Sequence, residues 1–306
     1  MSATNDTVPI LFDTDIGNDI DDAVCLAYLL KQPRCKLLGV TTVSGPVQQR
    51  AALADAVCRA AGRADIPIRA GTRSGINLGP VQDSCPQAAV LPRFKHTPPE
   101  EFRAGEAVGF LREQIRARPG EITLLAVGPM TNLGLLFAMD PEILSLLKRL
   151  VLMCGVFTNR GSRPMGWREW NAICDPVATA CVYRARPAEH LSVGLDVTTH
   201  CRMDSTECVK RFNQIGGPLS VVAAMTEVWA EKVHLVTFHD PLAGALVFDP
   251  ELCTYQDGLV NVELKSDHAQ GMTHFNPGAQ EKPHKICLEV KAEAFFEHYF
   301  GTCGKK

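Results

Sequence analysis

Asp13-Thr14-Asp15-Ile16-Gly17-Asn18-Asp19-Ile20-Asp21-Asp22 directly follows the apolar run Pro9–Phe12, and five of these ten residues are aspartates. We name this segment the acidic turn. A strand-length apolar run, a turn and the helical pattern Ile20–Lys31 predict the first half of a βαβ unit. Two carboxylates about 4 Å apart repel by roughly 4 kcal/mol at an effective dielectric of about 20, so converging acids protonate or bind a cation. Because carboxylate oxygens suit Ca²⁺ or Mg²⁺ better than Zn²⁺, the acidic turn predicts a hard divalent-cation site.

Strand-length apolar runs and helical patterns alternate along most of the chain. The predicted strands are Pro9–Phe12, Lys36–Val43, Ile66–Ala70, Ile122–Val127, Leu150–Met153 and Leu191–Leu195, and the predicted helices are Ile20–Lys31, Val47–Ala61, Gly105–Arg118, Met130–Ala138 and Pro176–Arg184. This alternation predicts an α/β fold with a mainly parallel, Rossmann-like, doubly wound central sheet that is flanked by helices. Such sheets bind ligands at the carboxyl ends of their strands.

The last third of the chain follows a different pattern. After Asp204 the periodicity is mostly helical to about Phe248, and it continues with two short strands, Leu259–Leu264 and Lys285–Val290, and a final helix. We therefore expect a largely helical C-terminal third. Because no composition shift is strong enough to mark a boundary, residues 1–306 are expected to form a single domain.

The composition narrows the class of protein. With 46% hydrophobic residues, 21% charged residues and a formal net charge of -3, the chain lacks the basic surface that nucleic-acid binding requires. No apolar run approaches the roughly 20 residues that span a bilayer. Met1–Val8 lacks the basic and apolar parts of a signal peptide. We expect a cytoplasmic protein without nucleic-acid or membrane partners, in which the 12 scattered cysteines are reduced and buried.

Other acidic loops are possible explanations of the acidic turn. An EF-hand loop needs glycine at its sixth position and glutamate at its twelfth, whereas Gly17 is fifth and a valine is twelfth counting from Asp13, so the spacing excludes it. A strand followed by Asp-x-Asp also opens the Mg²⁺-dependent aspartyl-phosphate phosphatases of the haloacid dehalogenase type, in which Asp13 would be the nucleophile. That chemistry does not need Asp21 and Asp22, but the hypothesis stays open. Asp19 is expected to cap the following helix or to lie exposed.

Together with four later segments, the acidic turn resembles the inosine-uridine-type nucleoside hydrolases, which open with a strand and Asp-x-Asp-x-Gly followed by Asp-Asp-Ala. The later segments are Ala-Val-Gly-Pro-Met-Thr-Asn-Leu at 126–133, Trp-Arg-Glu-Trp-Asn at 167–171 with Asp-Pro at 175–176, Phe-His-Asp-Pro at 238–241 and Gly-Met-Thr at 271–273. They occur in family order from residue 8 to about 290. The resemblance implies a Ca²⁺-dependent ribonucleoside hydrolase, an N-glycosidase of nucleoside metabolism and salvage that forms a homodimer or homotetramer.

The resemblance also implies a ligand set for the metal. Asp15, Asp22 and Asp240 would ligate Ca²⁺ through their side chains, and Val127 would ligate it through its backbone carbonyl. Asp13 would lie behind these ligands and orient them.

Four further residues are implied to hold the small-molecule ribonucleoside. Asp21 would accept a hydrogen bond from a ribose hydroxyl, and Glu169 and Asn171 would hold the 5' side of the ribose. Asn159 is a looser match for a further substrate contact. The neighbouring Trp170 is expected to pack in the core, although an aromatic ring there could also stack on a nucleobase.

Hydrolysis of an N-ribosidic bond needs an activated water and a protonated leaving group. Asp15, adjacent to the metal and the water, would be the general base. His239 would donate or relay the proton, because imidazole titrates near working pH, or it would orient its neighbour Asp240.

One departure from the family pattern bears on activity. Pro46 stands where the family often has asparagine, and proline cannot donate a hydrogen bond. A non-enzymatic nucleoside- or ribose-binding homologue that has lost turnover therefore remains an alternative hypothesis.

Overall fold

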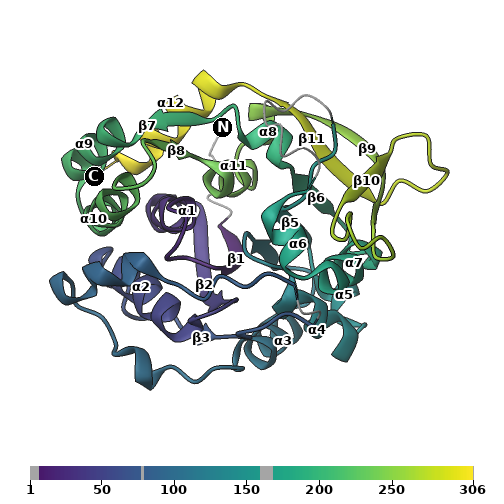
Figure 1. Cartoon of the computed structure of the whole chain (residues 1–306), viewed down its shortest axis with the longest axis horizontal. Coiled ribbons are helices and arrows are strands. Elements are labelled where there is room, and N and C mark those ends of the chain that lie inside the picture. Colours follow the sequence, from purple (N-terminus) through teal and green to yellow (C-terminus); the bar gives the residue numbers. More distant parts are fainter. Residues whose placement is uncertain (1–6, 77–78, 159–167, 306) are drawn as a thin grey trace.

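The computed structural model describes residues 7–76, 79–158 and 168–305 (Figure 1). Its main strands are β1 (Val8–Thr14), β2 (Cys35–Thr42), β3 (Ile68–Ala70), β4 (Thr123–Ala126), β5 (Arg149–Met153), β6 (His190–Val193), β9 (Cys253–Val262), β10 (Thr273–Asn276) and β11 (His284–Val290). They form one nine-stranded sheet in the order β10-β9-β11-β6-β5-β4-β1-β2-β3. All neighbours from β11 to β3 are parallel, and β9 is antiparallel to both β10 and β11. The predicted mainly parallel α/β sheet is confirmed.

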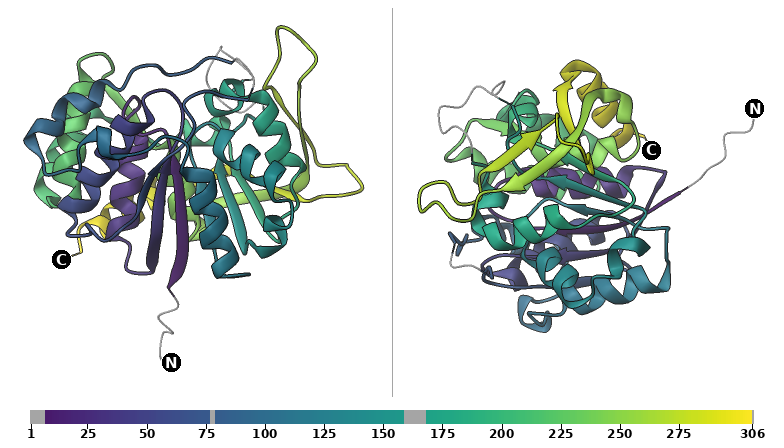
Figure 2. Two further views of the ribbon diagram at one scale, coloured as in Figure 1. Left: turned by 90° about the horizontal axis from the view of Figure 1, so that it is seen from below. Right: turned by 90° about the vertical axis from the view of Figure 1, so that its right-hand side faces the viewer.

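The helices cover both faces of this sheet (Figure 2). They are α1 (Asp21–Lys31), α2 (Val47–Ala60), α3 (Ala107–Ala117), α4 (Thr131–Met139), α5 (Ile143–Leu146), α6 (Trp170–Cys174), α7 (Pro176–Arg184), α8 (Leu195–Thr198), α9 (Ser205–Ile215), α10 (Pro218–Ala230), α11 (His239–Leu246) and α12 (Ala292–Cys303). Ile10 and Phe12 of β1 pack in one core with Val24 of α1, whereas Leu11 packs in a second core with Leu133 of α4. Because alternate side chains of a strand point to opposite faces, β1 is buried on both.

The expectation of a largely helical C-terminal third is not confirmed. Helices α9 to α12 are present, but β9, β10 and β11 extend the sheet, with β11 parallel to β6 and β9 antiparallel to its two neighbours. The 10-residue β9 has exposed and half-buried positions along much of its length. It includes the polar segment Gln256-Asp257-Gly258, which hides the hydrophobic signal of a strand. The remaining strands, β7 (Arg202–Asp204) and β8 (Leu235–Thr237), form a separate antiparallel pair. Within the described residues, every helix is too short or too polar to cross a membrane.

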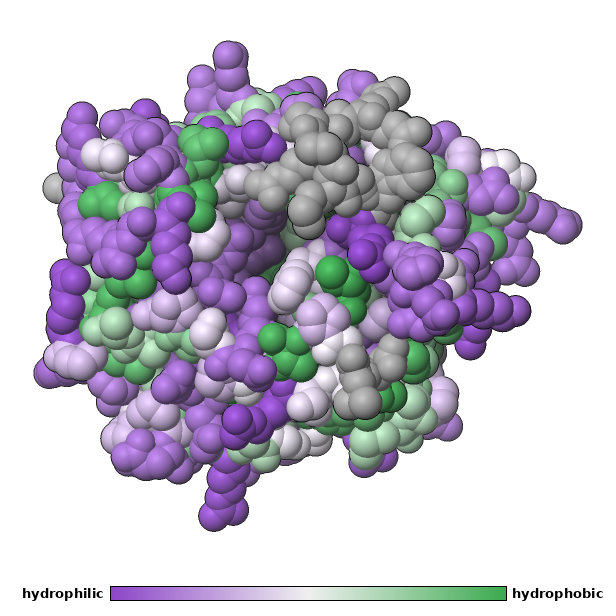
Figure 3. Space-filling view, in the orientation of Figure 1, coloured by the Kyte–Doolittle hydropathy of each residue, from purple (hydrophilic) through white to green (hydrophobic). Residues whose placement is uncertain are grey.

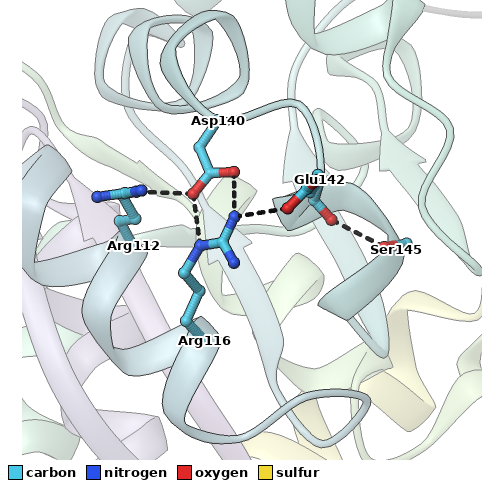
Figure 4. Close-up of polar contacts among 5 residues, drawn as sticks. All are labelled: Arg112, Arg116, Asp140, Glu142 and Ser145. Carbon is cyan, nitrogen blue, oxygen red and sulfur yellow. Dashed lines mark hydrogen bonds and ion pairs between the residues drawn. The ribbon is translucent and has the colours of Figure 1, made fainter.

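A charged cluster joins α3 to the end of α4 (Figure 4). Arg112 Nε lies 2.7 Å from Asp140 Oδ2, and Arg116 donates to both oxygens of Asp140 at 2.7 and 2.6 Å. Arg116 also reaches Glu142 Oε2 at 3.0 Å. The hydrogen bonds from Arg116 and Arg112 hold the pKa of Asp140 well below its usual value.

Replacing Asp140 with asparagine is expected to lower the melting temperature at neutral pH. A carboxyl group with a lowered folded-state pKa contributes stability above its unfolded pKa of about 4 and loses it as the pH falls through the folded value. The gap to wild type should therefore shrink when thermal unfolding is followed from pH 7 to pH 3. Glu142→Gln is the control, because Glu142 is the 80% exposed end of the same cluster and the change should be small. A gap that stays constant with pH would contradict this electrostatic account.

Candidate functional site

The carboxyl ends of β1, β2 and β4 meet at the first aspartate of the acidic turn. In the sheet Asp13 is opposite Thr41 on one side and Ala126 on the other. Its side chain is fully buried, and its Oδ1 accepts hydrogen bonds from Thr41 Oγ1 and, at 2.8 Å, from Asn132 Nδ2. Its Oδ2 has no hydrogen-bond partner among the described residues. Burial raises the pKa of Asp13 to about 7. A carboxyl group so enclosed is poorly placed to be the nucleophile of a phosphatase.

Three buried carboxyl groups converge beside this strand end. Asp21 and Asp22 lie in the first turn of α1 and Asp240 in the first turn of α11, and one oxygen of each lies within 4.8 Å of the others. Their side chains are 5%, 4% and 2% exposed. Burial first, and then repulsion among the carboxylates, raises the pKa of all three. This acidic cluster could hold a metal ion, because a cation allows all three groups to ionise together.

Asp15 adjoins the acidic cluster without being one of its three members. Its backbone N–H donates to Asp22 Oδ1 at 3.1 Å, and Thr14 Oγ1 donates to the same oxygen. Burial raises the pKa of Asp15 to about 6. The cluster thus contains Asp21, to which the family resemblance gives a ribose contact, and not Asp15, to which it gives a metal contact. Asp19 is half-buried and accepts a hydrogen bond at 2.7 Å from the backbone of Ile20, at the start of α1.

The Val127 carbonyl and the Asn171 amide are in direct contact. Val127 follows β4, and its N–H donates to the Asp13 carbonyl at 2.9 Å. Its own carbonyl accepts from Asn171 Nδ2 at 2.6 Å, and that amide also donates to the Met153 carbonyl at 3.0 Å. The structure therefore places Asn171 beside the strand ends of β4 and β5.

Glu169 caps the N-terminus of α6. Its carboxylate accepts from the N–H groups of Asn171, Ala172 and Gly155 at 2.6, 3.0 and 3.1 Å. The side chain is 3% exposed, and burial raises its pKa to about 7. Glu169 is therefore rigidly held, whatever else it contacts.

His239 is the half-buried first residue of α11, next to Asp240. Its Nδ1 lies 2.6 Å from Thr198 Oγ1 of α8, which fixes the direction of the ring. Nothing in the sequence pattern marks Thr198, because its partner is 41 residues away.

Trp170 does not pack in the core as expected, because it is 39% exposed. The side chain of Gln82 has its hydrogen bonds satisfied when its nitrogen faces Asp15 Oδ2 and its oxygen accepts from Trp170 Nε1, each at 3.2 Å. The indole thus lies near the acidic turn. Asn159 and Trp167 lie outside the described residues.

In the orientation of Figure 1, the molecular surface has a hollow near its middle that hydrophilic residues border in part (Figure 3).

Known proteins resemble this chain over most of its length. The family model described as inosine-uridine preferring nucleoside hydrolase matches residues 10–297. Uridine nucleosidase 1 of Arabidopsis thaliana is 29% identical, over 94% of this chain and 91% of its own length. The pyrimidine-specific ribonucleoside hydrolase RihA of Enterobacter sp. (strain 638) is 31% identical, over 87% of each chain.

Solved structures share the fold. A plant nucleoside hydrolase superposes with a TM-score of 0.82 at 23% identity, covering 98% of this chain and 99% of its own. A purine-preferring ribonucleoside hydrolase from Gardnerella vaginalis gives 0.81 at 23% identity, covering 97% and 98%. From the match over residues 10–297, the chain belongs to the inosine-uridine preferring nucleoside hydrolase family, whose members are N-glycosidases that act on ribonucleosides.

Proposed function

We propose that this enzyme hydrolyses ribonucleosides to free nucleobase and ribose in a Ca²⁺-dependent reaction, with Asp15 as general base and His239 as proton donor. The observation that supports it most is the acidic cluster of Asp21, Asp22 and Asp240 beside Asp15. Three buried carboxyl groups within 4.8 Å of one another are costly without a cation, and a family of metal-dependent hydrolases gives that cation a use.

The oxygen donors present fit Ca²⁺. We assign Asp15, Asp22, Asp240 and the carbonyl of Val127 as its ligands, with Asp13 behind them as an orienting group. All are oxygens, which Ca²⁺ prefers and of which it takes several. When bound, the ion would neutralise the carboxylates, orient ribose hydroxyls and favour deprotonation of a water molecule.

Asp15 is suited to accept the proton of the attacking water. A general base works best when its pKa lies near the working pH, and burial raises that of Asp15 to about 6. Its position is constrained because its N–H is bonded to Asp22 Oδ1.

The remaining assigned residues act on ribose and leaving group. Asp21, Glu169 and Asn171 are proposed to hold the ribose hydroxyls, and Asn159, outside the described residues, a further part of the substrate. The negative charge of Asp21 and Glu169 would also stabilise the positive charge that develops on the ribosyl ring. His239, oriented by Thr198, is proposed to donate a proton to the departing nucleobase.

The direct test is nucleobase release from uridine, cytidine, inosine, adenosine and guanosine, with and without EDTA. Uridine comes first because four curated relatives are named uridine nucleosidase or probable uridine nucleosidase. We expect release that EDTA abolishes and added Ca²⁺ restores. Release unaffected by EDTA would overturn the calcium assignment. Tight nucleoside binding without cleavage would instead select the binding homologue suggested by Pro46.

We further propose, from the family resemblance, that the chain is a single cytoplasmic domain that assembles as a homodimer or homotetramer. Light scattering coupled to size-exclusion chromatography would measure the assembly, and a monomeric mass would contradict it.

A further inference from the structure

A buried guanidinium lies beneath the acidic turn. Arg50 belongs to α2, and its side chain is 0% exposed. Its Nε donates to the Ser44 carbonyl at 2.7 Å, and its Nη1 donates to the carbonyls of Asp15 and, at 3.0 Å, Ile16. Its Nη2 donates to the Gln82 carbonyl at 3.2 Å. Four of its acceptors are backbone carbonyls, and Nη2 also lies 3.4 Å from the side-chain amide of Gln82, so Arg50 acts chiefly on the path of the main chain.

These carbonyls come from three segments that are distant in sequence. Asp15 and Ile16 belong to the acidic turn, Ser44 follows β2, and Gln82 lies in the loop between β3 and the 3-10 helix Pro86–Arg93. Ser44 has a φ of 68°, a left-handed conformation that is costly for a residue with a side chain. A planar fork of five N–H donors can reach several carbonyls at once, whereas the ammonium of lysine is a single point of charge.

The same segments place the side chain of Gln82 next to Asp15, the proposed general base. In the amide orientation that satisfies its hydrogen bonds, the nitrogen of Gln82 faces Asp15 Oδ2 and its oxygen accepts from Trp170 Nε1, each at 3.2 Å. Arg50 thus bonds to the main chain of both Asp15 and Gln82, and the two side chains meet above it. The loop that carries Gln82 cannot shift relative to the acidic turn without breaking these bonds.

We infer that Arg50 is a positioning residue, which fixes the Asp15 carboxylate and the Gln82 amide relative to one another through the backbone. The inference rests on the proposed function, because it gives Asp15 a role in the reaction. A displacement of about 1 Å at a reacting group can cost about 10²-fold in rate, so the expected effect is large.

Two substitutions separate positioning from charge. Arg50→Met removes the charge and the hydrogen bonds, whereas Arg50→Lys keeps the charge but cannot span the three segments. Both are expected to lower kcat for uridine by about 10²-fold, measured per folded molecule. Arg59→Met is the matched control, since Arg59 lies on the same helix, is 37% exposed and pairs with Asp55 away from the site. It should leave kcat unchanged.

A second readout needs no turnover. In metal-free protein, amides of residues 79–85 should exchange with deuterium about tenfold faster in Arg50→Lys than in Arg59→Met, the size expected for loss of one hydrogen bond to a charged group. This measurement stands even if wild type cleaves no nucleoside, a result that would overturn the proposed function alone. Should Arg50→Met fail to fold, Arg50→Lys carries the test.

A double-mutant cycle with Gln82→Ala completes the design. If Arg50 acts by holding Gln82 against Asp15, the Gln82→Ala change should have little further effect on kcat/KM in the Arg50→Lys background. Additive losses, an Arg50→Lys enzyme with wild-type kcat, or unchanged exchange at residues 79–85 would each overturn the inference.

Discussion

Replacing Asp15 with asparagine is expected to lower kcat/KM for ribonucleosides by about 10³-fold, within the range that a positioned general base contributes. Asparagine keeps an oxygen at nearly the same place but cannot take a proton. The loss should therefore fall on kcat, and calcium or terbium titration should still detect an ion at the site. Nucleobase release under saturating Ca²⁺ measures the effect.

Asp19→Asn is the matched control for that substitution. Asp19 lies in the same acidic turn and is also an aspartate, but its Oδ1 accepts from the backbone of Ile20 at the start of α1 and it has no assigned role in the reaction. Its replacement should change kcat/KM little. An Asp15→Asn enzyme within about tenfold of wild type would show that another group is the base.

Removal of calcium is expected to lower the melting temperature more at pH 8 than at pH 5. Burial raises the pKa of Asp13 to about 7 and of Asp15 to about 6, and burial with mutual repulsion raises those of the acidic cluster. The folded metal-free protein thus binds more protons than the unfolded chain above about pH 4, so its stability falls as the pH rises. A bound cation removes this cost.

The size of the effect follows from mass action. An ion present at 100 times its Kd stabilises the folded state by about 2.7 kcal/mol, or roughly 5 °C for a chain of this size. Differential scanning calorimetry of EDTA-treated and Ca²⁺-loaded protein from pH 5 to pH 8 measures it. Mg²⁺ at the same concentration is the control. A Ca²⁺ effect that is equal at the two pH values would contradict the coupling to these carboxyl groups.

The sheet was predictable because its signal is local. The predicted strand Leu150–Met153 begins one residue after β5 does and ends at the same residue. The predicted strand Ile122–Val127 extends one residue beyond β4 at each end. The predicted strand Leu191–Leu195 runs too far, since Leu195 begins α8. Apolar residues continue across that boundary, so hydrophobicity alone does not mark it. The acidic turn could be identified from the sequence equally well, because so high a density of acidic residues has no structural role in a short loop.

The partners of the site residues could not be predicted from local pattern. Arg50 lies on the core-facing side of α2, whereas an arginine is usually found at the surface of a protein. Asn132 lies within a segment that resembles the family, yet its contact with Asp13 depends on how β4 and β1 pair. Trp170 was expected in the core because it matches a position that the family normally fills with an apolar ring, and its exposure depends on where α6 docks.

The placement of Asp240 on α11, beside α1, sets an order of events during synthesis. About 220 residues separate Asp22 from Asp240. At about 5–20 residues per second, the ribosome needs roughly 10 to 45 s to deliver the third carboxylate after the first two. A nascent chain already contains the residues of β1 to β6 before Asp240 is made, but until then it cannot complete the acidic cluster. With the ligands proposed above, calcium can stabilise only chains in which α11 has been made and docked, so the ion distinguishes chains that contain α11 from shorter ones.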